Sequence, residues 1–254
     1  MSYPIYPDKY RLPAMLTAEK MIEFRRQQGG LGNYPAPEIV ILCLYKGIMK
    51  YFPLKYSSRR VTGFLGDLYL LNKTDGKIGV MGNFGIGSPV IVNLAEEMAA
   101  WGARRIVILS LAGVLQPDLN PGDIVICNHA IRDEGTSYHY LPAEKYVYAS
   151  SHFVSNLSSS FEKSNLQYFV GGTWSTDAPY RESYEEASAY QKEGVMAVDM
   201  ESSGLFAVGQ VRGVETASVF VAGDSLAKPR WSAPPDMGIL HAKLKKCLRV
   251  LVNL

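Results

Sequence analysis

The sequence predicts an α/β fold, with a single domain in which helices flank a central mixed, largely parallel sheet. Short apolar, β-branched runs alternate with longer segments of helical period, which is the pattern of strands joined by crossover helices. The chain has 254 residues, of which 47% are apolar and 20% are charged. This length is long enough for a full core and typical of one domain. We therefore expect one domain over residues 1–254.

Apolar runs mark the predicted strands. The first three lack polar alternation, which indicates strands that are buried on both faces. The predicted strands are residues 39–44, 78–81, 106–109, 123–127, 195–198 and 217–221. The last two are followed closely by Asp199 and Asp224, so each is expected to deliver a carboxylate near a strand end.

Capping residues mark the predicted helices. Thr17 and Ser88 stand where N-caps are favoured, and Pro89 takes the first helical position. Ser183 and Glu186 are spaced as a capping box. The predicted helices are residues 17–28, 89–101, 183–194, 202–211 and 238–254. We interpret the basic face of the last helix as solvated surface.

Composition excludes several classes of function. The chain carries 26 basic and 24 acidic residues, a balance that gives no general field for DNA or an anionic membrane. We therefore expect a small-molecule partner, with no nucleic acid and no membrane. No basic and apolar leader or long apolar run suggests secretion or membrane insertion.

Cysteine and histidine usage favours a cytoplasmic protein without a metal site. Cys43, Cys127 and Cys247 are few and widely separated, which indicates neither a disulfide framework nor a zinc site. His129 and His139 lack the spacing of common metal sites, so we expect them to be packed histidines.

A short glycine segment stands between a predicted strand and a predicted helix. Gly85 and Gly87 allow close backbone approach, and the free N–H groups at a helix start suit an anion or a polar ligand. Val90 stands where a dinucleotide-binding sequence needs a third glycine, and no Walker lysine follows. A tight turn without a ligand is the alternative.

Three carboxylates stand at predicted strand ends. A carboxylate at Asp199 or Glu201 can accept two hydrogen bonds from vicinal hydroxyls, although either residue could instead cap the next helix. Asp224 could protonate a leaving group in surroundings that raise its proton affinity. A turn or capping role is the alternative for Asp224.

An aromatic segment is a candidate base-binding surface. Trp174, Pro179, Tyr180 and Arg181 combine ring faces with charge after a strand-like run at 171–173. Aromatic faces can stack on a planar base. The alternative is that these rings belong to the core.

Taken in order, these segments resemble the nucleoside phosphorylase family that includes purine nucleoside phosphorylase and uridine phosphorylase. The match covers roughly Gly76 to Asp224 and leaves a divergent N-terminal segment of about 1–60. The segments that carry it are Gly85-Ile86-Gly87-Ser88-Pro89, Ala112-Gly113 with Gln116-Pro117, Asn120-Pro121-Gly122-Asp123-Ile124-Val125, Ser175-Thr176-Asp177 with Tyr180, Met200-Glu201-Ser202 and Gly223-Asp224.

The resemblance implies a role for each matched position. Met200 and Glu201 bind ribose, with Glu201 accepting from its hydroxyls, while the main chain at Ala112 and Gly113 bounds the base together with Pro179 and Tyr180. Asp224 matches the acid that protonates N7 of a departing purine while phosphate attacks C1′. The resemblance implies no metal or cofactor. It does imply a homo-oligomer, either a dimer, a trimer or a hexamer. Uridine-cleaving members use a Gln-x-Arg tripeptide after the position of Tyr180, and its absence here favours a purine.

Departures from the family pattern concentrate at the phosphate site. A Gly-Asp-Pro loop with a phosphate-binding arginine is replaced by residues 44–48. A further departure is the family's N-terminal histidine, which reaches the ribose 5′ end of a neighbouring subunit and is absent here, since no histidine precedes His129. In the register that aligns Gly113, the positions of a phosphate-binding arginine and hydroxyl are Ile108 and Leu111. Neither side chain can hold an anion. The cations that could replace the missing ones are Arg59, Arg60, Arg132, Arg181, Lys228 and Arg230.

Three functions are compatible with this pattern. The first is cleavage of the N-glycosidic bond of a purine or pyrimidine nucleoside by phosphate, giving free base and ribose 1-phosphate. The second is hydrolysis by a nucleosidase in the same pocket, suggested by Ile108 and Leu111. The third is a nucleoside-binding protein that has lost catalysis.

Overall fold

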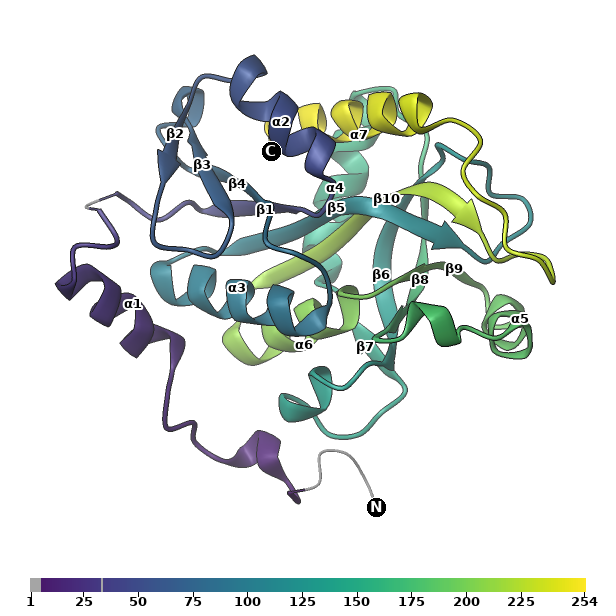
Figure 1. Ribbon diagram of the computed structural model, residues 1–254, viewed down its shortest axis with the longest axis horizontal. Coiled ribbons are helices and arrows are strands. Elements are labelled where there is room, and N and C mark those ends of the chain that lie inside the picture. The colour runs from purple at the N-terminus through teal and green to yellow at the C-terminus, as the bar shows by residue number, and fades with distance from the viewer. Residues whose placement is uncertain (1–5, 33) are drawn as a thin grey trace.

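A mixed sheet of ten strands organises the described part of the chain, residues 6–32 and 34–254, in the computed structural model (Figure 1). Residues 1–5 and 33 of the predicted domain lie outside the described residues. The strands are β1 (Ile39–Cys43), β2 (Ser58–Val61), β3 (Asp67–Leu71), β4 (Ile78–Gly82), β5 (Arg105–Val114), β6 (Ile124–Asp133), β7 (Tyr146–Tyr148), β8 (Phe169–Thr176), β9 (Val195–Asp199) and β10 (Glu215–Ser225). The predicted α/β class with a central mixed sheet is confirmed.

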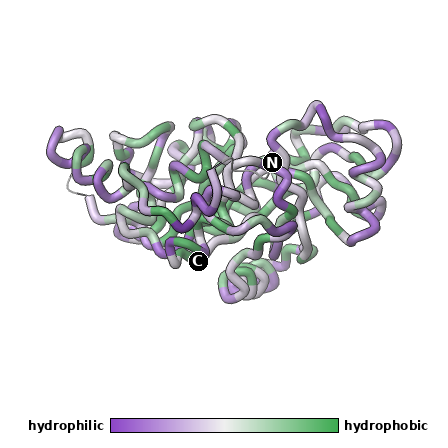
Figure 2. Tube along the Cα trace, turned by 90° about the horizontal axis from the view of Figure 1, so that it is seen from below, coloured by the Kyte–Doolittle hydropathy of each residue, from purple (hydrophilic) through white to green (hydrophobic). Residues whose placement is uncertain are grey.

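Helices cover both faces of the sheet. They are α1 (Ala18–Gln27), α2 (Lys46–Lys55), α3 (Ser88–Trp101), α4 (Ser151–Lys163), α5 (Tyr184–Lys192), α6 (Ser202–Arg212) and α7 (Met237–Leu251). Helices α3 and α6 lie on one face with α1 outside α3, whereas α2, α4 and α7 lie on the other (Figure 1). Figure 2 shows hydrophobic segments gathered in the interior and hydrophilic ones on the outer loops. No helix in the described ranges is long and apolar enough to cross a membrane.

Strand β5 is the centre of the topology because it changes neighbour along its length. Its first half pairs in parallel with β1, which continues through β4 to the antiparallel β3 and β2. Its second half pairs with β9 in antiparallel fashion, and its other edge pairs with β10 throughout. Strands β10, β6, β8 and β9 then close a ring with β5. The ends of β9 and β10 therefore lie on either side of the same stretch of β5.

Burial explains why the strands were recognisable from sequence. Along β5, Ile106 and Ile108 pack in the core layer under α3 and α6, whereas Val107 and Leu109 pack in the layer under α2, α4 and α7. All four side chains are at most 1% exposed. A strand with helices on both faces has no polar side, so its sequence shows a continuous apolar run.

The predicted caps hold at two helices and fail at one. Thr17 accepts a hydrogen bond from Lys20 N (3.4 Å), and Ser183 accepts one from Glu186 N (3.1 Å). The N-cap of α3 is Gly87, with φ of 98°, and not Ser88 as predicted. A glycine there adopts the positive φ at low cost, which places the buried Ser88 inside the first turn.

Candidate active site

The candidate residues meet beside the second half of β5. Gly113 of β5 is paired with Val198 of β9, and Ala112 is paired with Ala222 of β10. The segment with Glu201 follows β9, and Asp224 lies near the end of β10. The predicted delivery of carboxylates to two strand ends is thus confirmed, and both strands flank the end of β5.

Gly113 lies where any side chain would be obstructed. A Cβ at this position would lie 2.8 Å from Val198 Cγ1, 2.9 Å from Leu226 Cδ1 and 3.5 Å from Asp224 Oδ2. Contacts below 3.0 Å would force the neighbours to move. Glycine is therefore required by the close packing of Val198 and Leu226 against β5, and its buried main chain lies beside the Asp224 carboxylate.

Glu201 is held directly by the glycine segment. Gly87 N donates a hydrogen bond of 2.6 Å to Glu201 Oε1, and Met200 N donates one of 3.2 Å to Oε2. Only 4% of Glu201 is exposed. The carboxylate therefore occupies the N-terminal end of α3, where the helix dipole favours negative charge. The anion expected at the glycine segment is, in this structure, the protein's own carboxylate.

Ser88 and Gly204 bring the two helices of this face together. A Cβ on Gly204 of α6 would lie 2.9 Å from Ser88 Oγ, so only glycine permits this crossing. Ser88 Oγ also donates a hydrogen bond of 3.0 Å to Met200 O. The start of α3 and the residue before Glu201 are therefore fixed to each other.

Asp199 supplies the side chain that caps α6, although Glu201 occupies the N-cap position. Its Oδ2 accepts hydrogen bonds from Glu201 N (3.1 Å) and Ser202 N (2.7 Å), while its Oδ1 accepts from Ser175 Oγ (2.6 Å) and Thr173 Oγ1 (3.2 Å). This saturated carboxylate ties β8, β9 and α6 together. The sequence left open whether each acid caps the helix or binds a ligand. In the structure the Asp199 side chain has the capping role, so the Glu201 side chain is the one available for a ligand.

Burial perturbs both acids. Desolvation is the main cause that raises the pKa of Glu201 to about 7, and the neighbouring Asp199 carboxylate raises it further. Burial likewise raises the pKa of Asp199, against the hydrogen bonds from Ser175 and Ser202. A buried acid near neutrality is typical of functional sites.

We expect Glu201→Gln to remove a pH-dependent loss of stability. The folded-state pKa of Glu201, about 7, lies above the ordinary value of 4.5. Between these pH values the unfolded chain releases the proton while the folded protein keeps it, so the free energy of unfolding falls as pH rises and stays reduced above pH 7. Urea unfolding at pH 5 and pH 8 should show the variant gaining about 2 kcal/mol on the wild type at the higher pH.

The control for this pH effect is Glu185→Gln, which changes an exposed glutamate in the first turn of α5. It should follow the wild type at both pH values. An equal difference between Glu201→Gln and wild type at pH 5 and pH 8 would contradict the assignment.

Asp224 lies in a β-bulge. The pairing of β10 with β5 shifts between Ala222 and Ser225, so Gly223 and Asp224 interrupt the ladder. Bulges re-aim side chains and are frequent beside active sites. Asp224 Oδ2 accepts a hydrogen bond of 2.7 Å from Trp231 Nε1. Asp224 lies within β10 and the helix that follows is capped by Asp236, so Asp224 takes neither a turn nor a capping position.

Glu182 is a second acid on the Asp224 side of the site. Burial raises the pKa of Glu182 to about 7, and the carboxylates of Asp224 and Glu186 raise it further. Sequence reasoning missed Glu182 and Trp231. Glu182 could have been found from the sequence, because it directly follows Arg181, which was selected as a candidate. Trp231 could not, because it stands in a proline-containing loop that has no periodic pattern.

The aromatic segment is divided between core and surface. Trp174 is 1% exposed, packs with Ile131 and Val198, and donates a hydrogen bond of 2.9 Å from Nε1 to Asp133. The prediction that Trp174 stacks on a base is therefore wrong, because only 1% of this residue is exposed. Pro179, Tyr180 and Arg181 form a short exposed 3₁₀ turn, and Tyr180 is 100% exposed.

The positions expected to hold phosphate are apolar. Ile108 is fully buried in the core, and Leu111 packs against the opposite core layer. Arg132 is engaged elsewhere, since it donates to Ser137 Oγ (2.9 Å) and Pro142 O (2.6 Å) and lies over the Tyr138 ring.

Other cations lie on other elements or on the surface. Arg60 pairs with Asp67 across β2 and β3, and Arg59 lies over the ring of Tyr34. Arg181, Lys228 and Arg230 are exposed. The described residues also contain no cluster of three or more His, Cys, Asp or Glu side chains that could hold a metal ion.

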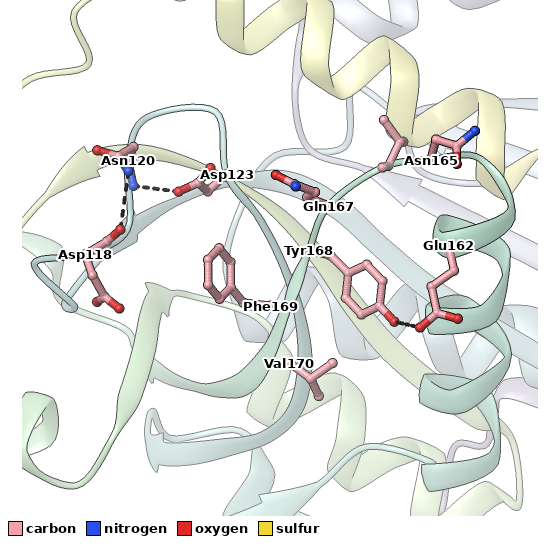
Figure 3. Close-up of a pocket in the computed structure, with 10 residues that line it drawn as sticks. Asp118, Asn120, Asp123, Glu162, Asn165, Gln167, Tyr168, Phe169 and Val170 are labelled. Atoms are coloured by element: carbon pink, nitrogen blue, oxygen red, sulfur yellow. Dashed lines mark hydrogen bonds between the residues drawn. The ribbon is translucent and has the colours of Figure 1, made fainter.

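A separate pocket of about 990 Å³ lies between the turn before β6 and the start of β8 (Figure 3). Its polar groups bond to one another: Asn120 N donates to Asp123 Oδ2 (2.8 Å), and Tyr168 donates to Glu162 (2.6 Å). Gly122 N donates to Ala222 O, and Ala222 N donates to Asp123 O, at 2.8 Å each. The segment around Asn120 is therefore a turn that supports β10 before its bulge.

Comparison with known proteins identifies relatives over most of the chain. A family model described as the phosphorylase superfamily matches residues 52–249. A uridine phosphorylase of Haemophilus influenzae is 29% identical over 211 residues, which are 78% of this chain and 80% of that protein. A guanosine phosphorylase of Halorubrum lacusprofundi is 27% identical over 173 residues, 66% of this chain and 72% of that protein.

A solved structure shares the fold. The crystal structure of a uridine phosphorylase from Vibrio fischeri superposes with a TM-score of 0.71 at 24% identity. The superposition covers 86% of this chain and 93% of that chain. At this identity the likeness shows the fold alone.

Proposed function

Because the chain belongs to the phosphorylase superfamily, we propose that it cleaves the N-glycosidic bond of a nucleoside at the site between β9 and β10. The products are the free base and ribose 1-phosphate. Enzymes of this type are pentosyltransferases that use inorganic phosphate as second substrate and need no cofactor. A homo-oligomer is part of the proposal.

The Glu201 carboxylate is the observation that carries the proposal. It is buried, faces the N-terminal end of α3 and receives two backbone N–H groups, from Gly87 and Met200. An ionised carboxylate has further lone pairs, so it can accept from the two vicinal hydroxyls of a ribose. Asp199 fixes the backbone on which Glu201 stands.

The opposite side of the site suits the base. The main chain at Gly113 adjoins the Asp224 carboxylate, and Glu182 adds a second acid. Two carboxyl groups favour a base that presents hydrogen-bond donors or a protonatable nitrogen. Purine N7 is such a nitrogen, so we propose a purine nucleoside with Asp224 as general acid.

The proposed mechanism separates charge between the two acids. Asp224 delivers a proton to N7 as the glycosidic bond lengthens, so the base leaves as a neutral molecule. Glu201 holds the ribose through its hydroxyls while C1′ takes on oxocarbenium character. Phosphate then attacks C1′. The chain contributes orientation and proton transfer.

Hydrolysis is the second candidate, and the apolar phosphate positions favour it. With Ile108 and Leu111 in place of an arginine and a hydroxyl, the protein lacks charge-assisted contacts of about 1.5–3 kcal/mol each. Water, unlike a dianion, needs no such contacts to reach C1′.

Product analysis tests the proposal. We expect chromatography of purine nucleosides incubated with the protein to show free base and ribose 1-phosphate only when phosphate is present. Release of free ribose at the same rate without phosphate would establish the nucleosidase. Nucleoside that binds in calorimetry and is recovered intact would instead identify a binding protein and contradict both enzymatic candidates.

A further inference from the structure

We propose that Trp231 is a positioning residue that holds the Asp224 carboxylate through Oδ2 and so fixes its direction toward the departing base. The inference rests on the proposed nucleoside cleavage and adds to it a residue that lies outside every motif used above. Its basis is the hydrogen bond of 2.7 Å from Trp231 Nε1 to Asp224 Oδ2.

The loop after β10 returns Trp231 to the site. Ser225 and Ser232 form an isolated antiparallel bridge, with N–H to O=C hydrogen bonds of 2.9 Å in both directions. Leu226 N donates 2.9 Å to Val114 O, which extends the pairing with β5 beyond the bulge. Trp231 directly precedes the bridged Ser232, so the backbone that carries the indole is anchored next to the acid.

Because Asp224 lies in a bulge, its side chain is not oriented by regular strand pairing and requires a contact such as the one from Trp231. Ladder hydrogen bonds fix Ala222 and Ser225, but the register shifts between them, where Asp224 lies. The turn before β6 clamps Ala222 from the other side. The backbone is therefore held on both flanks, whereas the direction of the Asp224 side chain depends on what its oxygens contact.

Packing does not account for the position of Trp231. Its side chain is 64% exposed, whereas Trp101 and Trp174 are 6% and 1% exposed. An indole N–H is a donor only and carries no charge. It can orient a carboxylate without the neutralisation that an arginine or lysine would bring, which suits an acid that must exchange a proton.

A double-mutant cycle tests the coupling. Trp231→Phe keeps the ring and removes the donor, and we expect it to lower kcat about tenfold with a change in KM of under about threefold, because the loss concerns proton transfer rather than binding. In the Asp224→Ala background, the same substitution should change kcat by less than about twofold, because the residue through which it acts is gone.

Two results would overturn the inference while leaving the proposed function intact. One is a Trp231→Phe variant with wild-type kcat, and the other is an equal loss of kcat in both backgrounds. Tyr148→Phe is the control and should have no effect, because Tyr148 is an exposed ring on β7, away from the site. If the wild type releases no base from any nucleoside, the proposed function itself fails.

Intrinsic fluorescence tests the contact independently of catalysis. Trp231 is the exposed one of the three tryptophans. Asp224→Ala should shift the emission of the wild type, and the shift should vanish when Trp231 is already phenylalanine. An unchanged emission spectrum in Asp224→Ala would show that the two side chains do not interact and would overturn the inference.

Discussion

Asp224→Asn is expected to lower kcat/KM for purine nucleosides by about 10²- to 10⁴-fold, the usual contribution of a general acid. Asparagine keeps the shape of the side chain and can still accept the Trp231 hydrogen bond through its amide oxygen. It cannot deliver a proton to N7. The loss should therefore fall on kcat, with ground-state binding of the nucleoside largely kept.

The base dependence of this variant is its most informative readout. Uridine has no N7, so any cleavage of uridine should be far less sensitive to Asp224→Asn than cleavage of a purine nucleoside. Asp75→Asn is a matched control, because Asp75 is exposed, far from the site in the fold, and has a φ of 52° that asparagine also tolerates. A loss under about threefold for a purine nucleoside would contradict the assignment of the acid.

The strands were the most predictable part of the fold, but their ends were not. Strand β5 continues to Val114 and strand β10 to Ser225, in each case several residues past the apolar run from which the strand was predicted. The added residues include Ala112-Gly113 and Gly223-Asp224, whose types do not favour strands. They are extended because neighbouring strands pair with them, and partners distant in sequence leave no local signal.

Elements that depend on tertiary packing were missed. The serine-rich α4 has weak helix propensity, yet it forms because Phe153, Leu157 and Phe161 bury one face. Strand β8 was recognised only in part, as the strand-like run 171–173. A Cβ at Gly172 would lie 2.3 Å from His129 Nε2, so the glycine that weakens the strand signal is required by its neighbour.

The site was predictable as a set of motifs but not as a set of contacts. Order along the chain pointed to Glu201 and Asp224. It could not show which acid caps α6, because that depends on the hydrogen bonds from Glu201 N and Ser202 N to Asp199. Nor could it show that Trp174 faces the core, since residue type does not reveal on which side of β8 a ring lies.

The clustering of acids gives the site its chemical character. Glu201 and Glu182 both have a pKa of about 7, in each case chiefly because of burial and secondly because of a neighbouring carboxylate. Buried acids next to one another cost stability unless one is protonated. A nucleoside that donates hydroxyl and N–H groups would relieve this cost, and an anion would increase it. The surroundings of Glu201 and Glu182 are thus suited to contact the neutral nucleoside rather than the phosphate dianion.

Glu201→Ala is expected to weaken nucleoside binding and kcat/KM together by about 10²- to 10⁴-fold. The carboxylate would make two charge-assisted hydrogen bonds to the ribose hydroxyls, each contributing about 1.5–3 kcal/mol. Each 1.4 kcal/mol corresponds to about a factor of ten in affinity. Calorimetry with a purine nucleoside and initial-rate kinetics measure the two losses. Glu144→Ala, an exposed glutamate, should leave both unchanged.

The pH dependence of binding separates this role from a structural one. Only the ionised carboxylate accepts from both hydroxyls, and its pKa in the ligand-free protein is about 7. Nucleoside affinity of the wild type should therefore rise between pH 6 and pH 8, whereas the residual affinity of Glu201→Ala should not. Circular dichroism confirms that the variant is folded. A folded Glu201→Ala protein that binds nucleoside as tightly as the wild type would show that ribose is held elsewhere, and the site between β9 and β10 would have to be reassigned.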